Sequence, residues 1–276
     1  MFMRCFSTEI KLEFGELKEP AVLWGYIPNN FSEIDIDRKH PAVLVLPGGG
    51  YGYTSEREGE AVALRLVAEG ICAFVLKYHT APARFPVALS EAFTAIAYIR
   101  ENSEEYHVDS SNVSVCGFSA GGHLAASTGV HWDKEEILKG IGKEASEVRP
   151  DSLILCYPVI TSGEYTHEGS MSNLLAEKRQ DPELIAFNCL ETQVTEDTPR
   201  TFLWHTWDDG AVPVQNSLYF ATALANNKVV TEMHLYPHGH HGLSLGNHIV
   251  NGEWKYEERH PSAEWINKAV DFIYKK

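Results

Sequence analysis

Residues 114–126 read SVCGFSAGGHLAA, and this stretch decides the fold that we expect. A short apolar segment leads through the pattern G-x-S-x-G into a run of small residues with helical character. A turn of this kind between a strand and a helix holds its serine in a strained, exposed position, and the flanking glycines remove side chains that would collide there. The three fixed positions alone would match by chance in about one chain in ten. Their place between a strand and a helix makes Ser119 the predicted nucleophile.

Short apolar runs rich in β-branched residues recur on both sides of this stretch. Such runs suit parallel strands that are covered on both faces. Helically spaced apolar residues lie between them, and this alternation predicts an α/β fold with a mostly parallel, doubly wound sheet flanked by helices. The predicted strands are 41–46, 71–76, 113–116, 153–157, 201–205 and 232–236, with an edge strand at 21–27; the first two helical stretches carry Ala61, Leu64, Val67 and Ala68, then Leu89, Ala92, Phe93, Ile96 and Ile99.

Composition limits the class of protein. The 276 residues are 44% hydrophobic and 22% charged, which predicts one globular domain over 1–276. With 23 Lys and Arg against 38 Asp and Glu, the net charge is −15, so nucleic acid and anionic membranes are not expected as partners. The first thirty residues lack the features of a secretory signal, and a cytoplasmic location is expected. Three of the five cysteines, Cys72, Cys116 and Cys156, fall in apolar runs and are expected to be buried, reduced thiols.

One connection is much longer than a crossover in a sheet requires. It is polar, spans about 160–198, and contains two stretches that resemble short helices, 171–178 and 182–190. Long excursions from a compact sheet are commonly functional. We expect this insertion to form a lid or cap over the pocket.

An activated serine needs a general base and an acid that orients the base. Asp208 and Asp209 follow the predicted strand 201–205, where side chains point into the ligand crevice of such a sheet, although acidic residues are also ordinary in turns. The segment PHGHHG, residues 237–242, follows the next strand. It lacks the usual zinc spacings, so a base is favoured over a metal site, with His241 as the base. The chain order is then Ser, Asp, His, which is typical of this arrangement.

A glycine run, Gly48 to Gly50, follows the first core strand. Backbone N–H groups in such a run can donate to a developing oxyanion, and we assign this role to Gly49, Gly50 and the N–H of Ala120. A phosphate-binding loop is the rival interpretation, but neither of the usual phosphate-loop patterns is present. A plain tight turn would explain the glycine run alone, but not all four elements in this order.

Taken together, these segments resemble the α/β-hydrolase carbohydrate esterases and acetyl esterases, which are related to acetyl-xylan esterases and to the hormone-sensitive-lipase group. The resemblance covers roughly 41–246 and rests on residues 46–51, 57–60, 116–125, 209–214 and 241–242. In that family the aspartate stands four residues before the proline of a V-P element, which implies Asp209 rather than Asp208. The histidine stands immediately before a glycine, which agrees with His241. Pro47 stands where a histidine opens the loop in the lipase-like branch.

The resemblance implies a serine hydrolase of small acyl esters, with acetylated sugars among the substrates; fold alone does not fix the substrate. Such an enzyme needs no cofactor and no metal, and its partner is a small-molecule ester, which is an acetylated carbohydrate if the likeness extends that far. An exposed sheet edge near the N-terminus would allow a homodimer. Aromatic and histidine side chains near strand ends are candidates for lining the pocket. They are Tyr51, Tyr53, His123, Tyr157, Trp207 and His238, and we assign substrate binding to Tyr51, Tyr157, Trp207 and His238.

Two rival functions share the fold. A small serine peptidase of the prolyl-oligopeptidase kind has the same elbow and triad, but those enzymes usually carry a large additional domain. A non-catalytic binding protein would typically have lost the serine, the acid or the histidine, and all three residue types are present here. The sequence therefore favours an esterase.

Overall fold

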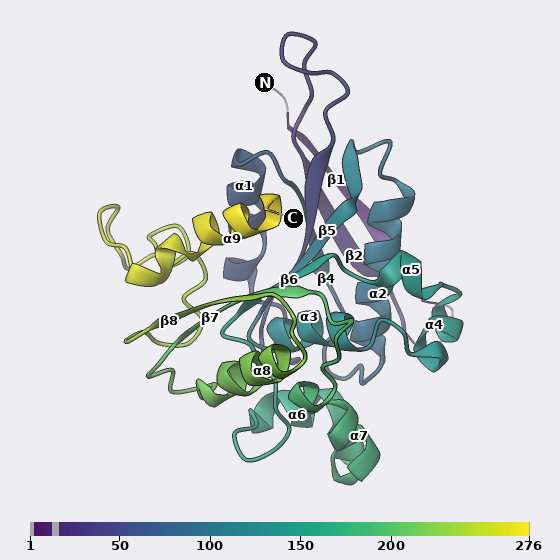
Figure 1. Cartoon of the computed structure of the whole chain (residues 1–276), viewed down its shortest axis with the longest axis vertical. Coiled ribbons are helices and arrows are strands. Elements are labelled where there is room, and N and C mark those ends of the chain that lie inside the picture. The colour runs from purple at the N-terminus through teal and green to yellow at the C-terminus, as the bar shows by residue number, and fades with distance from the viewer. Residues whose placement is uncertain (1–2, 13–16, 276) are drawn as a thin grey trace.

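The computed structural model describes residues 3–12 and 17–275. Its centre is a sheet of eight strands in the order β1-β2-β4-β3-β5-β6-β7-β8 (Figure 1). All neighbours from β4 to β8 pair in parallel, whereas β2 runs antiparallel to β1 and to β4. The strands are β1 (Arg4–Ile10), β2 (Ala21–Ile27), β3 (His40–Leu46), β4 (Cys72–Lys77), β5 (Val108–Phe118), β6 (Ser152–Cys156), β7 (Arg200–Thr206) and β8 (Thr231–Tyr236).

Helices cover both faces of the sheet, as the continuously apolar strands predict. The helices α1 and α9 lie on one face, and α2, α3 and α8 lie on the other (Figure 1). Along β3, Val43 and Val45 belong to the core on the first face, while Leu44 and Leu46 belong to the core on the second. The helices are α1 (Glu60–Ala68), α2 (Val87–Glu101), α3 (Ala120–Val130), α4 (Glu135–Ile141), α5 (Ala145–Val148), α6 (Glu168–Leu175), α7 (Pro182–Phe187), α8 (Gln215–Asn226) and α9 (Trp265–Tyr274), with 3-10 turns η1 (Glu56–Glu58), η2 (Ala176–Gln180), η3 (Leu190–Thr192) and η4 (Pro261–Glu264).

The predicted doubly wound α/β-hydrolase sheet is confirmed, with two corrections. The strand at 21–27 is not the edge, because β1 lies outside it; β1 alternates polar and apolar residues and its apolar signal is weak. In α1 the buried residues are Val62, Ala63 and Leu66, whereas Leu64 is exposed. The segment EAVALRLVA is apolar on more than one side, so periodicity could not choose the buried face.

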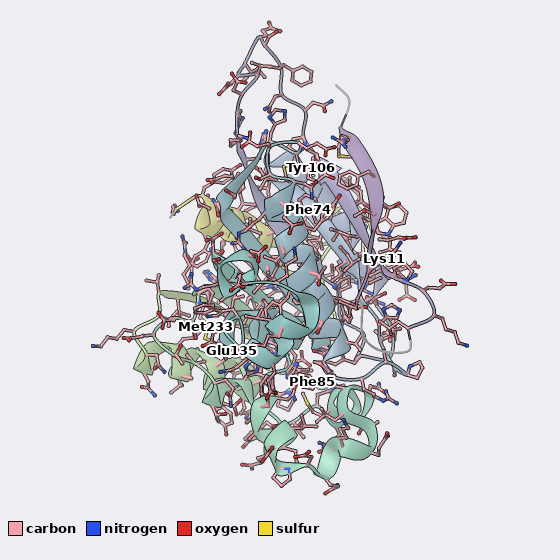
Figure 2. The ribbon with its side chains drawn as sticks, turned by 90° about the vertical axis from the view of Figure 1, so that its right-hand side faces the viewer. Lys11, Phe74, Phe85, Tyr106, Glu135 and Met233 are labelled. Atoms are coloured by element: carbon pink, nitrogen blue, oxygen red, sulfur yellow. The ribbon has the colours of Figure 1, made fainter. Side chains whose placement is uncertain are left out.

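Aromatic residues fill the end of the core next to β1. The rings of Phe74 on β4 and Tyr106 (Figure 2) lie 6.0 Å apart between their centroids. Phe6 on β1 stacks on Tyr106, with centroids 4.9 Å apart. The buried cysteines Cys72, Cys116 and Cys156 carry free thiols, as predicted. Among the described residues, no helix combines the length and apolar character needed to cross a bilayer.

The insertion at 160–198 contains α6, η2, α7 and η3, and it is tied to the body of the protein at several points. The Asn216 side chain of α8 accepts N–H bonds from Ile160 and Thr161 and donates to the Tyr165 carbonyl. Phe85 N–H donates to the Leu174 carbonyl at 2.9 Å. The insertion is thus held against the core by α8 and by the segment that precedes α2.

Candidate active site

The order of the strands places a crevice at the carboxyl ends of the parallel strands. The chain passes from β3 to β4 on one side and then to β5 on the other, so the order reverses between β3 and β5. Ligands of open α/β sheets bind outside the carboxyl ends of the strands at such a point. The glycine run follows β3 and Ser119 follows β5, so both lie at this crevice.

Ser119 occupies the turn between β5 and α3 with a φ of 54° and a ψ of −120°. This conformation is costly for a residue with a side chain, and neighbouring bonds maintain it. Ser119 N–H donates to the Cys156 carbonyl at 3.0 Å. Glycine is required beside it, because a Cβ at Gly121 would lie 2.1 Å from the Leu46 carbonyl oxygen and one at Gly117 would lie 2.0 Å from that of Gly121. The turn that G-x-S-x-G indicates is therefore present.

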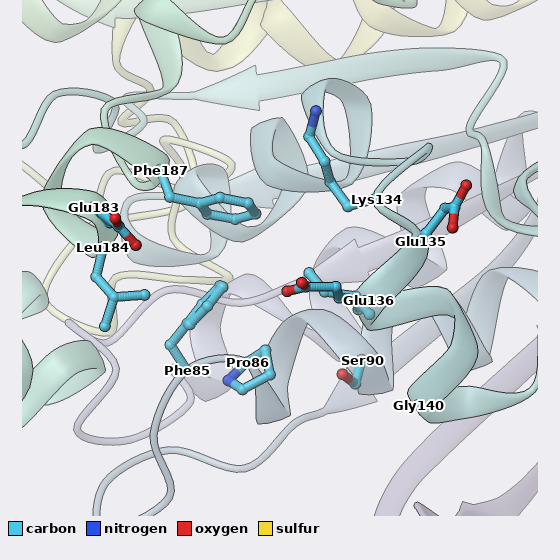
Figure 3. Close-up of a pocket in the computed structure, with 11 residues that line it drawn as sticks. Phe85, Pro86, Ser90, Lys134, Glu135, Glu136, Gly140, Glu183, Leu184 and Phe187 are labelled. Atoms are coloured by element: carbon cyan, nitrogen blue, oxygen red, sulfur yellow. The ribbon is translucent and has the colours of Figure 1, made fainter.

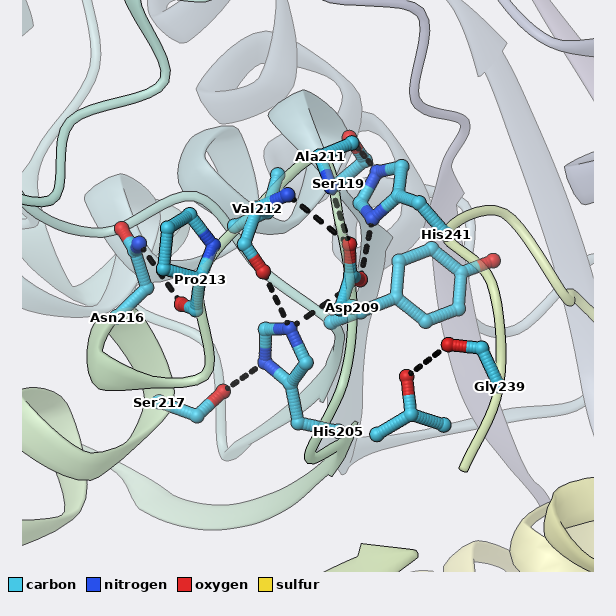
Figure 4. A network of polar contacts seen from close by, with 12 residues as sticks. Ser119, His205, Asp209, Ala211, Val212, Pro213, Asn216, Ser217, Gly239 and His241 are labelled. Carbon is cyan, nitrogen blue, oxygen red and sulfur yellow. Dashed lines mark hydrogen bonds and ion pairs between the residues drawn. The ribbon is translucent and has the colours of Figure 1, made fainter. Parts of the chain in front are cut away.

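A chain of hydrogen bonds connects the serine to the predicted base and acid (Figure 4). His241 Nε2 lies 2.7 Å from Ser119 Oγ, and His241 Nδ1 lies 2.6 Å from Asp209 Oδ2. Donation of Nδ1–H to the carboxylate leaves Nε2 as the acceptor for the serine hydroxyl. This is the geometry in which an imidazole can remove a hydroxyl proton.

Asp209 is held as a carboxylate. Its Oδ1 accepts the N–H groups of Ala211 and Val212 at 2.9 and 3.0 Å, and its Oδ2 lies 3.4 Å from Nε2 of the buried His205. Burial acts to raise the pKa of Asp209, but the bonds from His205, His241 and the backbone outweigh it and hold the pKa well below its ordinary value. The acid is therefore ionised and fixed in one orientation.

The glycine run offers backbone donors next to the serine. Among the described residues, the N–H groups of Gly49, Gly50 and Ala120 donate to no protein acceptor. Gly49 has a φ of 128°, and a Cβ there would lie 2.1 Å from the Tyr53 carbonyl oxygen, so no other residue fits this bend. Donors left free by a rigid turn can bind an anionic oxygen without reorganising.

The buried Glu58 side chain supports the glycine run through a hydrogen bond to its backbone. Glu58 is 3% exposed and accepts two hydrogen bonds, from the Gly48 N–H at 2.8 Å and from the Tyr157 hydroxyl at 2.7 Å. Burial raises the pKa of Glu58, while those two bonds act in the opposite direction. The Tyr157 ring packs edge-on against the His241 ring with centroids 5.0 Å apart. Glu58 thus links the glycine run to the histidine.

A cleft of about 400 Å³, which we name the serine cleft, opens beside Ser119. None of the four predicted substrate-binding residues lines it; of the two further pocket candidates, Tyr53 lines the cleft and His123 is buried. Tyr51 and Tyr157 are buried, with the Tyr51 hydroxyl bonded to His123 Nδ1; Trp207 is 59% exposed and His238 pairs with Asp208 at the surface. Polarity near strand ends could not distinguish residues that support the site from residues that face it. The residues that line the cleft are Gly49, Gly50, Tyr53, Ser55, Arg57, Glu58, Ser119, His167, His241 and Gly242.

The insertion forms one wall of the serine cleft through His167, which precedes α6. His167 Nδ1 accepts the Ser170 N–H at 3.2 Å, so the neutral ring carries its proton on Nε2. Burial lowers the pKa of His167, as does the charge of His241. From the same helix, Asn173 Nδ2 donates to the Gly50 carbonyl at 2.9 Å. The insertion therefore contributes both a cleft residue and a support for the glycine run.

Two other observations define the limits of this site. Over residues 3–12 and 17–275, no group of three His, Cys, Asp or Glu side chains is arranged to hold a metal ion. A separate hollow of about 570 Å³ lies between α2, α4 and α7, with Phe85, Leu184 and Phe187 among its lining residues (Figure 3). That hollow contains none of the predicted site residues.

The fold and the Ser119, His241 and Asp209 geometry define an α/β hydrolase. The BD-FAE family model matches residues 31–224, and the chain belongs to this family. The match ends before His241, whose position is fixed by the geometry of the loop after β8.

Known proteins that resemble the chain are hydrolases of acetyl esters and xylan. Endo-1,4-beta-xylanase B of Butyrivibrio fibrisolvens is 39% identical over 84% of this chain and 37% of that protein. Acetylxylan esterase of Xylanibacter ruminicola is 30% identical over 74% of this chain and 41% of that protein. The crystal structure of an acetyl ester-xyloside bifunctional hydrolase from Caldicellulosiruptor lactoaceticus superposes with a TM-score of 0.78 at 37% identity, covering 95% of this chain and 90% of that one. The chain spans less than half the length of the two curated relatives.

Proposed function

We propose that the chain hydrolyses small acyl esters, acetyl esters above all, through an acyl-enzyme on Ser119. The observation that carries this proposal is the continuous chain of bonds from Ser119 Oγ to His241 and on to the buried Asp209 carboxylate. A serine that lies on a strained elbow beside free backbone donors is otherwise unexplained by packing.

In the proposed mechanism His241 Nε2 takes the hydroxyl proton as Ser119 Oγ attacks the ester carbonyl carbon. The N–H groups of Gly49, Gly50 and Ala120 donate to the oxyanion of the tetrahedral intermediate. His241 then returns the proton to the alcohol oxygen as the ester bond breaks, which leaves the acyl group on the serine. Water, activated by the same nitrogen, releases the acid and restores the free hydroxyl.

A sugar is the alcohol component of the ester that we favour, which makes the substrate an acetylated sugar. The serine cleft is small and carries polar groups on Ser55, Arg57 and His167, which can bond to hydroxyl groups. The names of the acetylxylan esterase and of the acetyl ester-xyloside hydrolase support the same substrate class.

Hydrolysis of p-nitrophenyl esters from acetate to decanoate tests the proposal. We expect acetate to give the highest kcat/KM, and we expect Ser119→Ala and His241→Ala each to lower kcat by roughly 10³–10⁶-fold. His238→Ala is the matched control, since His238 lies in the same loop but outside the cleft, and it should retain wild-type activity. A fluorophosphonate probe should label the wild type and not Ser119→Ala. Folded wild type that neither turns over acetate nor takes the label would refute the proposal.

A further inference from the structure

A second hollow of about 680 Å³ adjoins the serine cleft, and Tyr53 and Ser55 line both. We name it the aromatic groove after its residues Trp24, Tyr26, Tyr53 and Tyr78, which lie together with Glu56 and Lys77. We propose that the aromatic groove is a subsite for the sugar chain that carries the ester, so that the substrate is an oligosaccharide or polysaccharide rather than a single sugar. This inference rests on the proposed function.

The groove exists because the helices leave part of the sheet uncovered. Trp24 of β2 pairs with Val75 of β4, and Val22 pairs with Lys77, so Trp24 and Lys77 face the same side of the sheet as α1. Further along β2, Tyr26 belongs to the core beneath α1. Trp24 lies beyond that cover and is 46% exposed.

Two of the four rings, those of Trp24 and Tyr53, are exposed, whereas Tyr26 and Tyr78 are buried and form the floor of the groove. Tyr53, at the boundary between the two hollows, is 65% exposed, although it lies on the loop that shapes the glycine run. Exposure of large aromatic side chains to water is costly, and two exposed rings in one hollow beside a reactive serine indicate a ligand. The volume falls within the range of about 300–1,000 Å³ that is typical of small-molecule sites, and it exceeds the needs of an acetyl group.

The chemistry of the lining matches a neutral sugar chain. One face of a pyranose ring presents C–H groups that pack on aromatic rings, while its rim presents hydroxyl groups that bond to charged side chains. The groove offers both, because Glu56 and Lys77 stand beside the rings with opposite charges. A polyanion is disfavoured by the net charge of −15. Continuity through Tyr53 and Ser55 allows one molecule to place its ester at Ser119 and its chain in the groove.

Binding without turnover tests the groove directly. In the Ser119→Ala background, titration calorimetry with the unacetylated β-1,4-linked xylose tetramer should show binding that Trp24→Ala weakens by about fivefold to tenfold. Trp24→Phe should restore most of the affinity, which separates loss of the ring from loss of folding. Trp207→Ala is the matched control, because Trp207 is exposed outside both hollows, and it should bind like the parent.

Kinetics separate this inference from the proposed function. Wild type and Trp24→Ala should hydrolyse p-nitrophenyl acetate equally, whereas Trp24→Ala should raise KM for an acetylated xylose tetramer by about fivefold to tenfold with little change for acetylated xylose. No hydrolysis of p-nitrophenyl acetate by the wild type would overturn the proposed function itself. Normal hydrolysis of p-nitrophenyl acetate, together with equal KM values of the wild type and Trp24→Ala for the acetylated tetramer, would overturn only the assignment of the groove to the sugar chain. A Trp24→Ala effect confined to acyl chain length would also overturn it, by assigning the groove to the acyl group.

Discussion

Two aspartate–histidine pairs join the same two loops, and only one of them adjoins the serine. Asp209 and His241 lie 2.6 Å apart with side chains 0% and 21% exposed. Asp208 and His238, one and three residues away, lie 2.9 Å apart with side chains 50% and 83% exposed. In both pairs an aspartate Oδ2 contacts a histidine Nδ1 at a similar distance. The comparison shows that the surroundings of a pair, rather than the pair itself, suit it to general-base chemistry.

The two carboxylates differ in their other hydrogen-bond partners and in their exposure to water. Asp209 is bonded by two backbone N–H groups and approached by the buried His205, so its charge is fixed where water is excluded. Asp208 accepts one backbone N–H, from Gly239, and is otherwise in solvent. Water screens an exposed ion pair and leaves it little effect on stability, whereas a buried, oriented carboxylate can hold an imidazole in one tautomer.

The largest expected difference between the pairs is in turnover. Asp209→Asn should lower kcat for p-nitrophenyl acetate by roughly 10⁴-fold, because an amide can donate to Nδ1 and stabilise the wrong tautomer of His241. Asp208→Asn should leave kcat within twofold of the wild type. Comparable losses in the two variants would show that the exposed pair also takes part in the reaction.

Much of the fold and the serine site could be predicted because backbone constraints are local. The elbow needs glycine at Gly117 and Gly121 for steric reasons, and the glycine run needs Gly49 for its φ, so these signals stand in the sequence itself. The predicted parallel strands agree with the observed ones to within one residue at each end, because both of their faces are buried; the exception is β5, which begins five residues before the predicted strand. The residues could not separate Asp208 from Asp209; that choice came from the family resemblance.

Features that depend on long-range packing could not be predicted from the sequence. Glu58 stands ten residues from Gly48, but its bond to the hydroxyl of Tyr157, 99 residues away, depends on the tertiary structure. The predicted pocket residues failed to line the cleft for the same reason: Tyr51 and Tyr157 turn inward to partners that only the tertiary structure provides. His167 lies on the wall of the cleft because the insertion packs against the glycine run.

The second expected effect concerns His205, which approaches Asp209 and has no counterpart beside Asp208 among the described contacts. His205→Leu removes the imidazole beside Asp209, and we expect kcat/KM for p-nitrophenyl acetate to fall by roughly 10–100-fold because the carboxylate is less firmly oriented. His205→Gln can still donate near Asp209 Oδ2 and should recover most of the loss. Thr206→Val is the control, since the Thr206 hydroxyl donates to the Gly239 carbonyl on the side of the exposed pair. Equal activity of the Leu and Gln variants would mean that His205 acts only by filling space.

The smallest expected effect is on the pH dependence of stability. The pKa of Asp209 is held below its ordinary value in the folded chain, so its ionised form stabilises the fold above about pH 4, and this contribution is lost as the pH falls through the folded pKa. Asp209→Asn should therefore lower the free energy of unfolding in urea by about 1 kcal/mol at pH 6, and the difference from the wild type should shrink below about pH 4. The pKa of Asp208 is also lowered, by the bond from His238, but its exposure lets solvent screen the charge, and Asp208→Asn should shift the urea midpoint by no resolvable amount at either pH. If the difference in unfolding free energy between wild type and Asp209→Asn stayed constant across this pH range, its cause would be lost packing and not the buried charge. The two pairs would then differ in how tightly their side chains pack, not in the energy of the carboxylate.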